Sequence, residues 1–193
     1  MVLLAGNKNI KTAVFISGKG SNLKSLIKFS KLKKSPITIE MIISNNYKSK
    51  GLIFGKIYKI KKKVFDFDKQ DKAEENVLNI LKKKKINLIC LAGFMKILSK
   101  NFIKKFNGQI LNIHPSLLPK YKGLNTHERA IKNKDIYSGC TVHFVTSKLD
   151  SGKIIYQRKV KISKKDTPKT LANKILVQEH KLYPKAIMKI FNL

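Results

Sequence analysis

Short apolar segments alternate with segments of helical periodicity along the whole chain. Segment 88–92 is a continuous apolar run, whereas segment 73–81 carries apolar residues at helical spacing. A run that is apolar on both faces is typical of a strand inside a parallel sheet that helices cover on both sides. The alternation therefore predicts an α/β fold, a single Rossmann-like, open, twisted and mostly parallel sheet with helices on both faces.

The expected elements follow from these two periodicities. We expect strands at 13–16, 37–43, 88–92, 110–113, 141–145 and 154–162, and a short edge strand within 58–67. We expect helices over 23–29, 73–81, 125–132 and from 168 onwards.

Polar residues and prolines predict how two of the helices begin and where the last one breaks. Asn125 and Glu128 have the spacing of an N-cap residue and its partner, and Thr167 before Pro168 forms a cap and first-turn pair. Because proline has no N–H to donate, Pro184 is expected to interrupt the last helix or to restart it.

The chain has 193 residues, of which 42% are hydrophobic, and no linker rich in Pro, Gly or Ser divides it. We expect one domain over residues 1–193, in which residues 1–11 are an N-terminal extension. The apolar runs are far shorter than the roughly 20 residues of a membrane helix, and the start lacks the basic region of a secretion signal. Cys90 and Cys140 lie in apolar runs, as buried thiols of a reducing compartment do. A cytoplasmic protein without a membrane partner is expected.

The net charge of +31 raises the question of a polyanionic partner. However, Arg129 and Arg158 are the only arginines, and the planar guanidinium is the group that reads bases and phosphates by paired contacts. Lys, Ile, Asn and Phe are all abundant, and all four have AT-rich codons. A drift of the genome towards AT would place lysine at positions that tolerate it, without selection for a partner. We therefore expect no specific nucleic-acid partner, with a polyanion-binding domain as the alternative.

The turn after the first strand, Gly18-Lys19-Gly20-Ser21-Asn22, is the first candidate site. Glycine lets the backbone approach a ligand closely, and free N–H groups at a helix N-terminus attract anions. Ser21 could cap the helix or donate its hydroxyl to a phosphate. A dinucleotide fingerprint and a Walker loop are both excluded by the spacing. A phosphate site and an ordinary turn both remain open on this pattern alone.

Asn112 and His114 at the end of a strand are the second candidate site. Residues two apart on a strand face the same side, and Pro115 ends the strand directly after them. This places the pair at the carboxyl edge of the sheet, where ligands bind in open α/β folds. An amide donor beside an imidazole can stabilise an oxyanion and exchange a proton.

Asp150, in the turn Leu149-Asp150-Ser151-Gly152, is a third candidate, because a carboxylate beside His114 would raise the pKa of the imidazole and orient it. On spacing alone, a purely structural turn explains Asp150 better. His127, His143 and His180 are expected to have structural roles, and no Cys or His spacing resembles a zinc site.

Six stretches together resemble the phosphoribosylglycinamide formyltransferases, a family of folate-dependent formyltransferases. They are ISGKGSNL (16–23), LAGFMKILS (91–99), ILNIHPSLLPKYKGLNTHERA (110–130), GCTVHFV (139–145), LDSGKII (149–155) and QEHKLYP (178–184). They occur in the order of the family and cover nearly the whole chain from Thr12 onwards.

The resemblance implies a role for each matching residue. The catalytic set falls on Asn112, His114 and Asp150, and the ribonucleotide site falls on Gly20, Ser21, Asn22 and Glu179. The folate site falls on Met95, Lys96, Ile97, Leu98 and Asn112. Lys96 stands where the family commonly has Arg, and a second folate-side Arg aligns with Gln70, or with Lys69 under a shift of one residue.

The resemblance also implies a reaction. The amine of glycinamide ribonucleotide attacks the formyl carbon of 10-formyltetrahydrofolate, the formyl-donor cosubstrate, in de novo purine biosynthesis, and no metal is required. Asn112 and protonated His114 would bind the formyl oxygen while Asp150 keeps the imidazole cationic. Methionyl-tRNA formyltransferases and formyltetrahydrofolate deformylases are the nearest alternatives, but each normally carries an extra domain. We expect a monomer or weak dimer.

Overall fold

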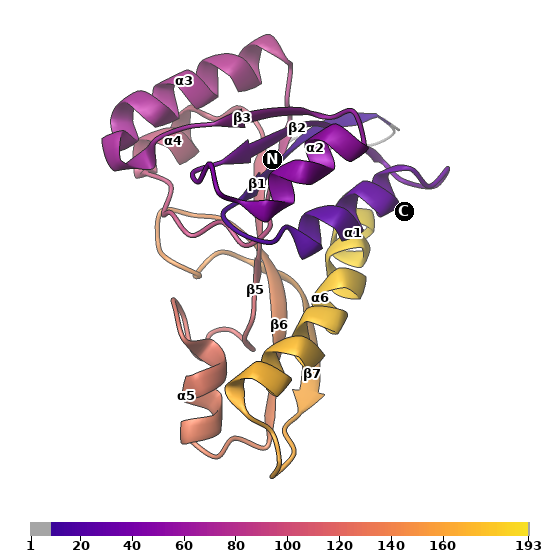
Figure 1. Ribbon diagram of the computed structural model, residues 1–193, viewed down its shortest axis with the longest axis vertical. Helices are drawn as coiled ribbons and strands as arrows, with labels where there is room; N and C mark the ends of the chain where they lie inside the picture. Colours follow the sequence, from indigo (N-terminus) through magenta and orange to yellow (C-terminus); the bar gives the residue numbers. More distant parts are fainter. Residues whose placement is uncertain (1–8, 193) are drawn as a thin grey trace.

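The computed structural model describes residues 9–192, and within them the chain forms one twisted sheet in the order β3-β2-β1-β4-β5-β6-β7 (Figure 1). β1 to β5 are parallel to one another, whereas β6 is antiparallel to both β5 and β7. The strands are β1 (Ile10–Ile16), β2 (Ile37–Ser44), β3 (Lys61–Val64), β4 (Leu88–Leu91), β5 (Gln109–His114), β6 (Tyr137–Phe144) and β7 (Ile154–Lys161). The predicted mostly parallel α/β sheet is confirmed.

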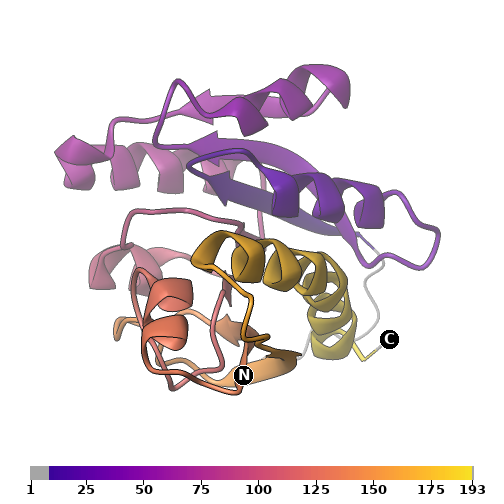
Figure 2. The same ribbon diagram turned by 60° about the horizontal axis from the view of Figure 1, so that its bottom comes forward.

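Helices cover both faces of the sheet, and each face has its own hydrophobic core. The helices are α1 (Ser21–Ser30), α2 (Ile53–Ile57), α3 (Gln70–Lys83), α4 (Lys100–Lys105), α5 (Thr126–Lys132) and α6 (Pro168–Ile190), with short 3₁₀ turns at Lys50–Leu52 and Phe67–Lys69. Val14 and Ile16 of β1 pack with α1 and α6, while Ala13 and Phe15 pack on the other face with α3 and α4. β1 is therefore buried on both faces, as its apolar run requires. Figure 2 shows α6 lying alongside α1 on their common face of the sheet.

The expected strands and helices are all present, with shifted ends. The low-hydrophobicity segment 58–67 holds β3, which is four residues long and forms one edge of the sheet. α2 and α4 are additional, because helices of five and six residues are too short to show a clear period. Of the expected extension 1–11, residues 1–8 lie outside the described residues, and Ile10 and Lys11 already belong to β1.

The expected interruption at Pro184 is wrong, because α6 continues through this residue to Ile190. A proline in this position cannot donate to the carbonyl of His180, one turn earlier. The hydroxyl of Ser25, in α1, donates to that carbonyl over 2.9 Å instead. A tertiary contact thus satisfies the oxygen that proline leaves without a helical partner.

The expected cap of α6 is confirmed, and Asn125 occupies the N-cap position of α5, but the side-chain cap bonds of α5 and α1 are absent within the described residues. The Thr167 hydroxyl accepts from the N–H of Thr170, and Pro168 follows in the first turn. Asn125 precedes α5 as expected, but with a φ of 57° and no hydrogen bond from its side chain to the helix. α1 begins at Ser21 after Gly20, again with no side-chain cap.

Cys90 and Cys140 are both buried, and burial raises the pKa of each thiol to about 12. Among residues 9–192, no helix combines the length and the apolar character that crossing a membrane requires.

Candidate active site

A cavity of about 770 Å³ opens where the carboxyl ends of β1, β4 and β5 meet. β1 lies between β2 and β4 in the sheet. After β1 the chain adds β2 and β3 on one side, and it then crosses to the other side of β1 to add β4 and β5. Ligands of open α/β folds bind at such a change of direction. The cavity also has the volume that is typical of a site for a small molecule.

The turn that begins α1 lies at this cavity because two glycines let two segments meet. Gly20 has a φ of +73°, and a Cβ built on it would lie 2.7 Å from the Cα of Gly51. A side chain at residue 20 would therefore clash with backbone that cannot move aside. As a result, Gly20, Ser21 and Asn22 line the cavity together.

Asn22, in the first turn of α1, and Glu179, in the middle of α6, meet at the cavity. Asn22 Nδ2 donates to Glu179 Oε2 over 2.7 Å, and both side chains are buried. Burial raises the pKa of Glu179, and the hydrogen bond from Asn22 offsets part of that increase. Asn22 Oδ1 is buried without a hydrogen-bond partner among the described residues, so an acceptor remains for a ligand that carries N–H or O–H groups.

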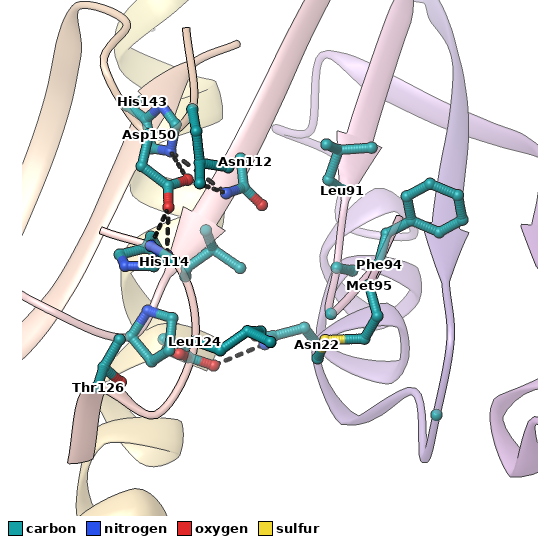
Figure 3. Close-up of a pocket in the computed structure, with 18 of the residues that line it drawn as sticks. Asn22, Leu91, Phe94, Met95, Asn112, His114, Leu124, Thr126, His143 and Asp150 are labelled. Atoms are coloured by element: carbon teal, nitrogen blue, oxygen red, sulfur yellow. Dashed lines mark hydrogen bonds and ion pairs between the residues drawn. The ribbon is translucent and has the colours of Figure 1, made fainter. Parts of the chain in front are cut away.

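Asn112, His114 and Asp150 come together at the end of β5 (Figure 3). Asp150 Oδ2 lies 3.4 Å from His114 Nδ1, and Asp150 Oδ1 lies 3.5 Å from Asn112 Nδ2. On the far side of the imidazole, His114 Nε2 donates to the carbonyl of Tyr121 over 2.8 Å. The backbone N–H of Gly123 donates to Asp150 Oδ2 over 2.9 Å. The three predicted residues thus form one cluster.

Asp150 reaches this cluster through a turn with special geometry. Its own φ is 45°, in the left-handed region, and it lies between β6 and β7. A Cβ at Gly152 would lie 1.7 Å from the carbonyl oxygen of Phe144, so only glycine allows the chain to pass this close to the end of β6. Residues with such rarely populated backbone conformations are concentrated at functional sites.

Burial changes the protonation expected for His114 and Asp150. Burial lowers the pKa of His114 by more than the Tyr121 carbonyl and the Asp150 carboxylate raise it. The expected influence of Asp150 on His114 is thus present in the raising direction, but burial outweighs it. Burial alone would raise the pKa of Asp150, but its contacts with His143 and the Gly123 N–H hold that pKa below its usual value. These shifts favour a neutral imidazole at His114 beside an ionised carboxylate at Asp150.

His143 belongs to this cluster, although the sequence predicted a structural role for it. It lies opposite Asn112 in the antiparallel pairing of β5 with β6. His143 Nδ1 donates to the Phe144 carbonyl over 2.8 Å, and its Nε2 lies 3.2 Å from Asn112 Nδ2 and 3.6 Å from Asp150 Oδ1. Only the register of β5 against β6 reveals this contact. His127, also expected to be structural, lines the same cavity.

The segment after β4 forms another wall of the cavity. Met95, Lys96, Ile97 and Leu98 all line it, and the apolar side chains of Met95 and Ile97 are 66% and 65% exposed. Lys96 Nζ forms an ion pair with Asp68 Oδ1 over 2.8 Å. The structure places Gln70 differently from the expected folate contact, because its amide is bonded to Glu74 and to the Ile97 carbonyl behind this wall.

The sequence and fold of this chain are similar to those of known proteins. The profile of the family described as formyl transferase matches residues 10–187. Phosphoribosylglycinamide formyltransferase of Haemophilus influenzae is 41% identical over 180 residues, which are 92% of this chain and 85% of that protein. A crystal structure of phosphoribosylglycinamide formyltransferase from Brucella melitensis is 39% identical, has a TM-score of 0.88, and covers 94% of this chain and 95% of that one.

Some similar proteins are much longer. The trifunctional purine biosynthetic protein adenosine-3 of Homo sapiens is 39% identical over 186 residues, which are 95% of this chain. The chain spans only 18% of the length of that human protein, so it corresponds to one part of it.

Proposed function

This chain belongs to the formyl transferase family, and we propose that it transfers the formyl group of 10-formyltetrahydrofolate to the amine of glycinamide ribonucleotide in de novo purine biosynthesis. The products are formylglycinamide ribonucleotide and tetrahydrofolate. The observation that carries the proposal is the cluster of Asn112, His114 and Asp150 at the cavity where β1, β4 and β5 end.

The transfer proceeds by addition and elimination. The amine nitrogen of the ribonucleotide forms a bond to the formyl carbon, and negative charge develops on the formyl oxygen. Asn112 Nδ2 donates a hydrogen bond to that oxygen, which is the kind of contact worth about 100- to 1000-fold in rate. The bond from the formyl carbon to folate N10 then breaks, and the carbonyl forms again.

One proton must move from the attacking amine to the leaving nitrogen. His114 is suited to receive it, because burial keeps the imidazole neutral and its Nδ1 faces Asp150. Once protonated, Nδ1 is held 3.4 Å from an ionised carboxylate, which stabilises the imidazolium. The His114 imidazolium then donates this proton to folate N10, so the imidazole is neutral again when the products leave.

The two substrates occupy different walls of the cavity. The phosphate of the ribonucleotide binds at Gly20, Ser21 and Asn22, with Glu179 contacting the glycinamide group. The formyl donor lies along Met95, Lys96, Ile97 and Leu98, where the exposed apolar side chains of Met95 and Ile97 suit a planar ring. The partners in this proposal are the two small molecules, the step as written uses no metal ion, and the chain acts as a monomer or weak dimer.

A transfer assay with three separate acceptors tests the proposal. Purified protein receives 10-formyltetrahydrofolate together with glycinamide ribonucleotide, initiator methionyl-tRNA or water alone, with the His114→Asn variant as the control. We expect formylation of the ribonucleotide alone and its loss in the variant. Transfer to tRNA or to water would assign the chain to another activity of the family, and no transfer by folded protein would favour a non-catalytic, polyanion-binding domain.

A further inference from the structure

The wall formed by residues 92–99 has no regular secondary structure between β4 and α4, although it lines the cavity. Its backbone must therefore be placed by hydrogen bonds to other segments. At its start, the N–H of Ser17 donates to the Gly93 carbonyl over 3.0 Å, and the N–H of Met95 donates to Ser17 Oγ over 2.8 Å. These contacts fix the first half of the wall to the end of β1.

Glu74 of α3 fixes the other end. This carboxylate is buried, with only 4% of the residue exposed. Glu74 Oε1 accepts from the backbone N–H of Ser99 over 2.8 Å, and Glu74 Oε2 accepts from the Ser99 hydroxyl. Ser99 in turn is the N-cap of α4, since its Oγ accepts from the N–H of Phe102. One buried carboxylate thus determines where the wall ends and α4 begins.

Gln70 connects this carboxylate to the middle of the wall. It lies one helical turn before Glu74, so both side chains leave the same face of α3. The two hydrogens of its amide serve two acceptors, the Ile97 carbonyl at 2.9 Å and Glu74 Oε1 at 2.9 Å. The residue that aligns with a folate-side contact therefore holds the backbone of the wall from behind.

We propose that Gln70 and Glu74 are positioning residues that hold the backbone of Ile97–Ser99 in the shape that binds the formyl donor, which rests on the proposed function. A segment that is already ordered loses little conformational entropy when a ligand binds, whereas an unbraced one must be ordered at the cost of affinity. Gln70 and Glu74 touch neither substrate, and they act on the affinity for the donor through the wall.

Two variants and a matched control test this proposal. Gln70→Leu places an apolar side chain, one atom shorter, at this half-buried position and removes both donors. Glu74→Gln preserves the shape of the carboxylate but replaces one accepting oxygen with an amide nitrogen. Glu75→Gln removes the charge of the next residue, which is exposed and whose side chain makes no hydrogen bond or ion pair within residues 9–192.

Tetrahydrofolate binding is measured by calorimetry, alongside steady-state kinetics and amide exchange of residues 95–99. For Gln70→Leu and Glu74→Gln we expect the Kd for tetrahydrofolate and the KM for the donor to rise about tenfold. We expect kcat and the KM for the ribonucleotide to change less than about threefold, with faster exchange at residues 97–99. Glu75→Gln is expected to match the wild type.

Three results would overturn the proposal. These are an unchanged Kd for tetrahydrofolate in both variants, an equal weakening in Glu75→Gln, or a lower melting temperature with binding and exchange unaltered. If the wild type transfers no formyl group, the proposed function fails by itself, while the tetrahydrofolate and exchange measurements still decide the role of Gln70 and Glu74.

Discussion

Asn22 Nδ2 donates to Glu179 Oε2 over 2.7 Å, although the two residues are 157 positions apart in the chain. The contact joins the first turn of α1 to α6, and both residues line the cavity. It places a buried carboxylate beside an amide oxygen that has no hydrogen-bond partner within residues 9–192, where a ligand with N–H groups can contact both.

Replacing Glu179 tests the ribonucleotide side of the cavity. Glu179→Gln keeps an oxygen that accepts from Asn22 but removes the negative charge, so the KM for glycinamide ribonucleotide should rise about tenfold. The KM for the formyl donor should remain close to that of the wild type. The control is Glu128→Gln, an exposed carboxylate lining the same cavity. An equal effect in both variants would mean that overall charge, rather than contact with Glu179, matters.

Removing the charge of Asp150 tests the proton transfer. Asp150→Asn keeps an oxygen that accepts from the Gly123 N–H but no longer stabilises a protonated His114. We expect kcat to fall about 100-fold or more, while the melting curve stays similar. Near-normal turnover in the folded variant would reject the role assigned to Asp150.

The pH dependence of kcat/KM reports the state of His114. Burial lowers its pKa below the ordinary value of 6.5, so the imidazole is neutral at pH 7 and gains a proton only at lower pH. Because the neutral form receives the proton, kcat/KM should be level above about pH 6.5 and fall as the pH decreases further. A profile that instead loses activity as the pH rises from 6.5 to 8 would show that protonated His114 is the active form.

His143 orients the amide of Asn112. In His143→Leu, the amide loses the ring nitrogen that lies 3.2 Å from its Nδ2 and can rotate away from the formyl oxygen. We expect kcat to fall about tenfold with both KM values nearly unchanged. In an Asn112→Ala background the same substitution should have little further effect, since no amide remains to be oriented. Additive losses in the double variant would argue against this coupling.

The contact between Ser25 and the His180 carbonyl explains how α6 tolerates Pro184. Ser25→Ala removes the donor of this carbonyl and should lower the free energy of unfolding by about 1 kcal/mol. In a Pro184→Ala background the backbone N–H of residue 184 supplies a donor, so the cost of Ser25→Ala should shrink. Denaturant unfolding of the four proteins measures both values, and equal costs in the two backgrounds would contradict the explanation.

Local pattern was sufficient to predict most of the elements. The apolar run 88–92 and the period of 73–81 predict β4 and α3, because burial on two faces and burial on one face leave different periodicities. Thr167 and Pro168 predict the start of α6, since a cap depends only on neighbouring residues. Pro184 was misread because the bond that replaces its missing donor comes from Ser25, far away in the chain.

For the site, the sequence alone determined that Asn112 and His114 lie together at the end of a strand, because alternate residues of a strand share a face. The spacing could not place Asp150, His143 and Glu179 beside the cavity, since their positions depend on a turn, a strand register and the packing of α6. The tertiary structure also decided the protonation of His114 and the orientation of Gln70. Burial and the nearest hydrogen-bond acceptor set those properties, and both depend on segments distant in the chain.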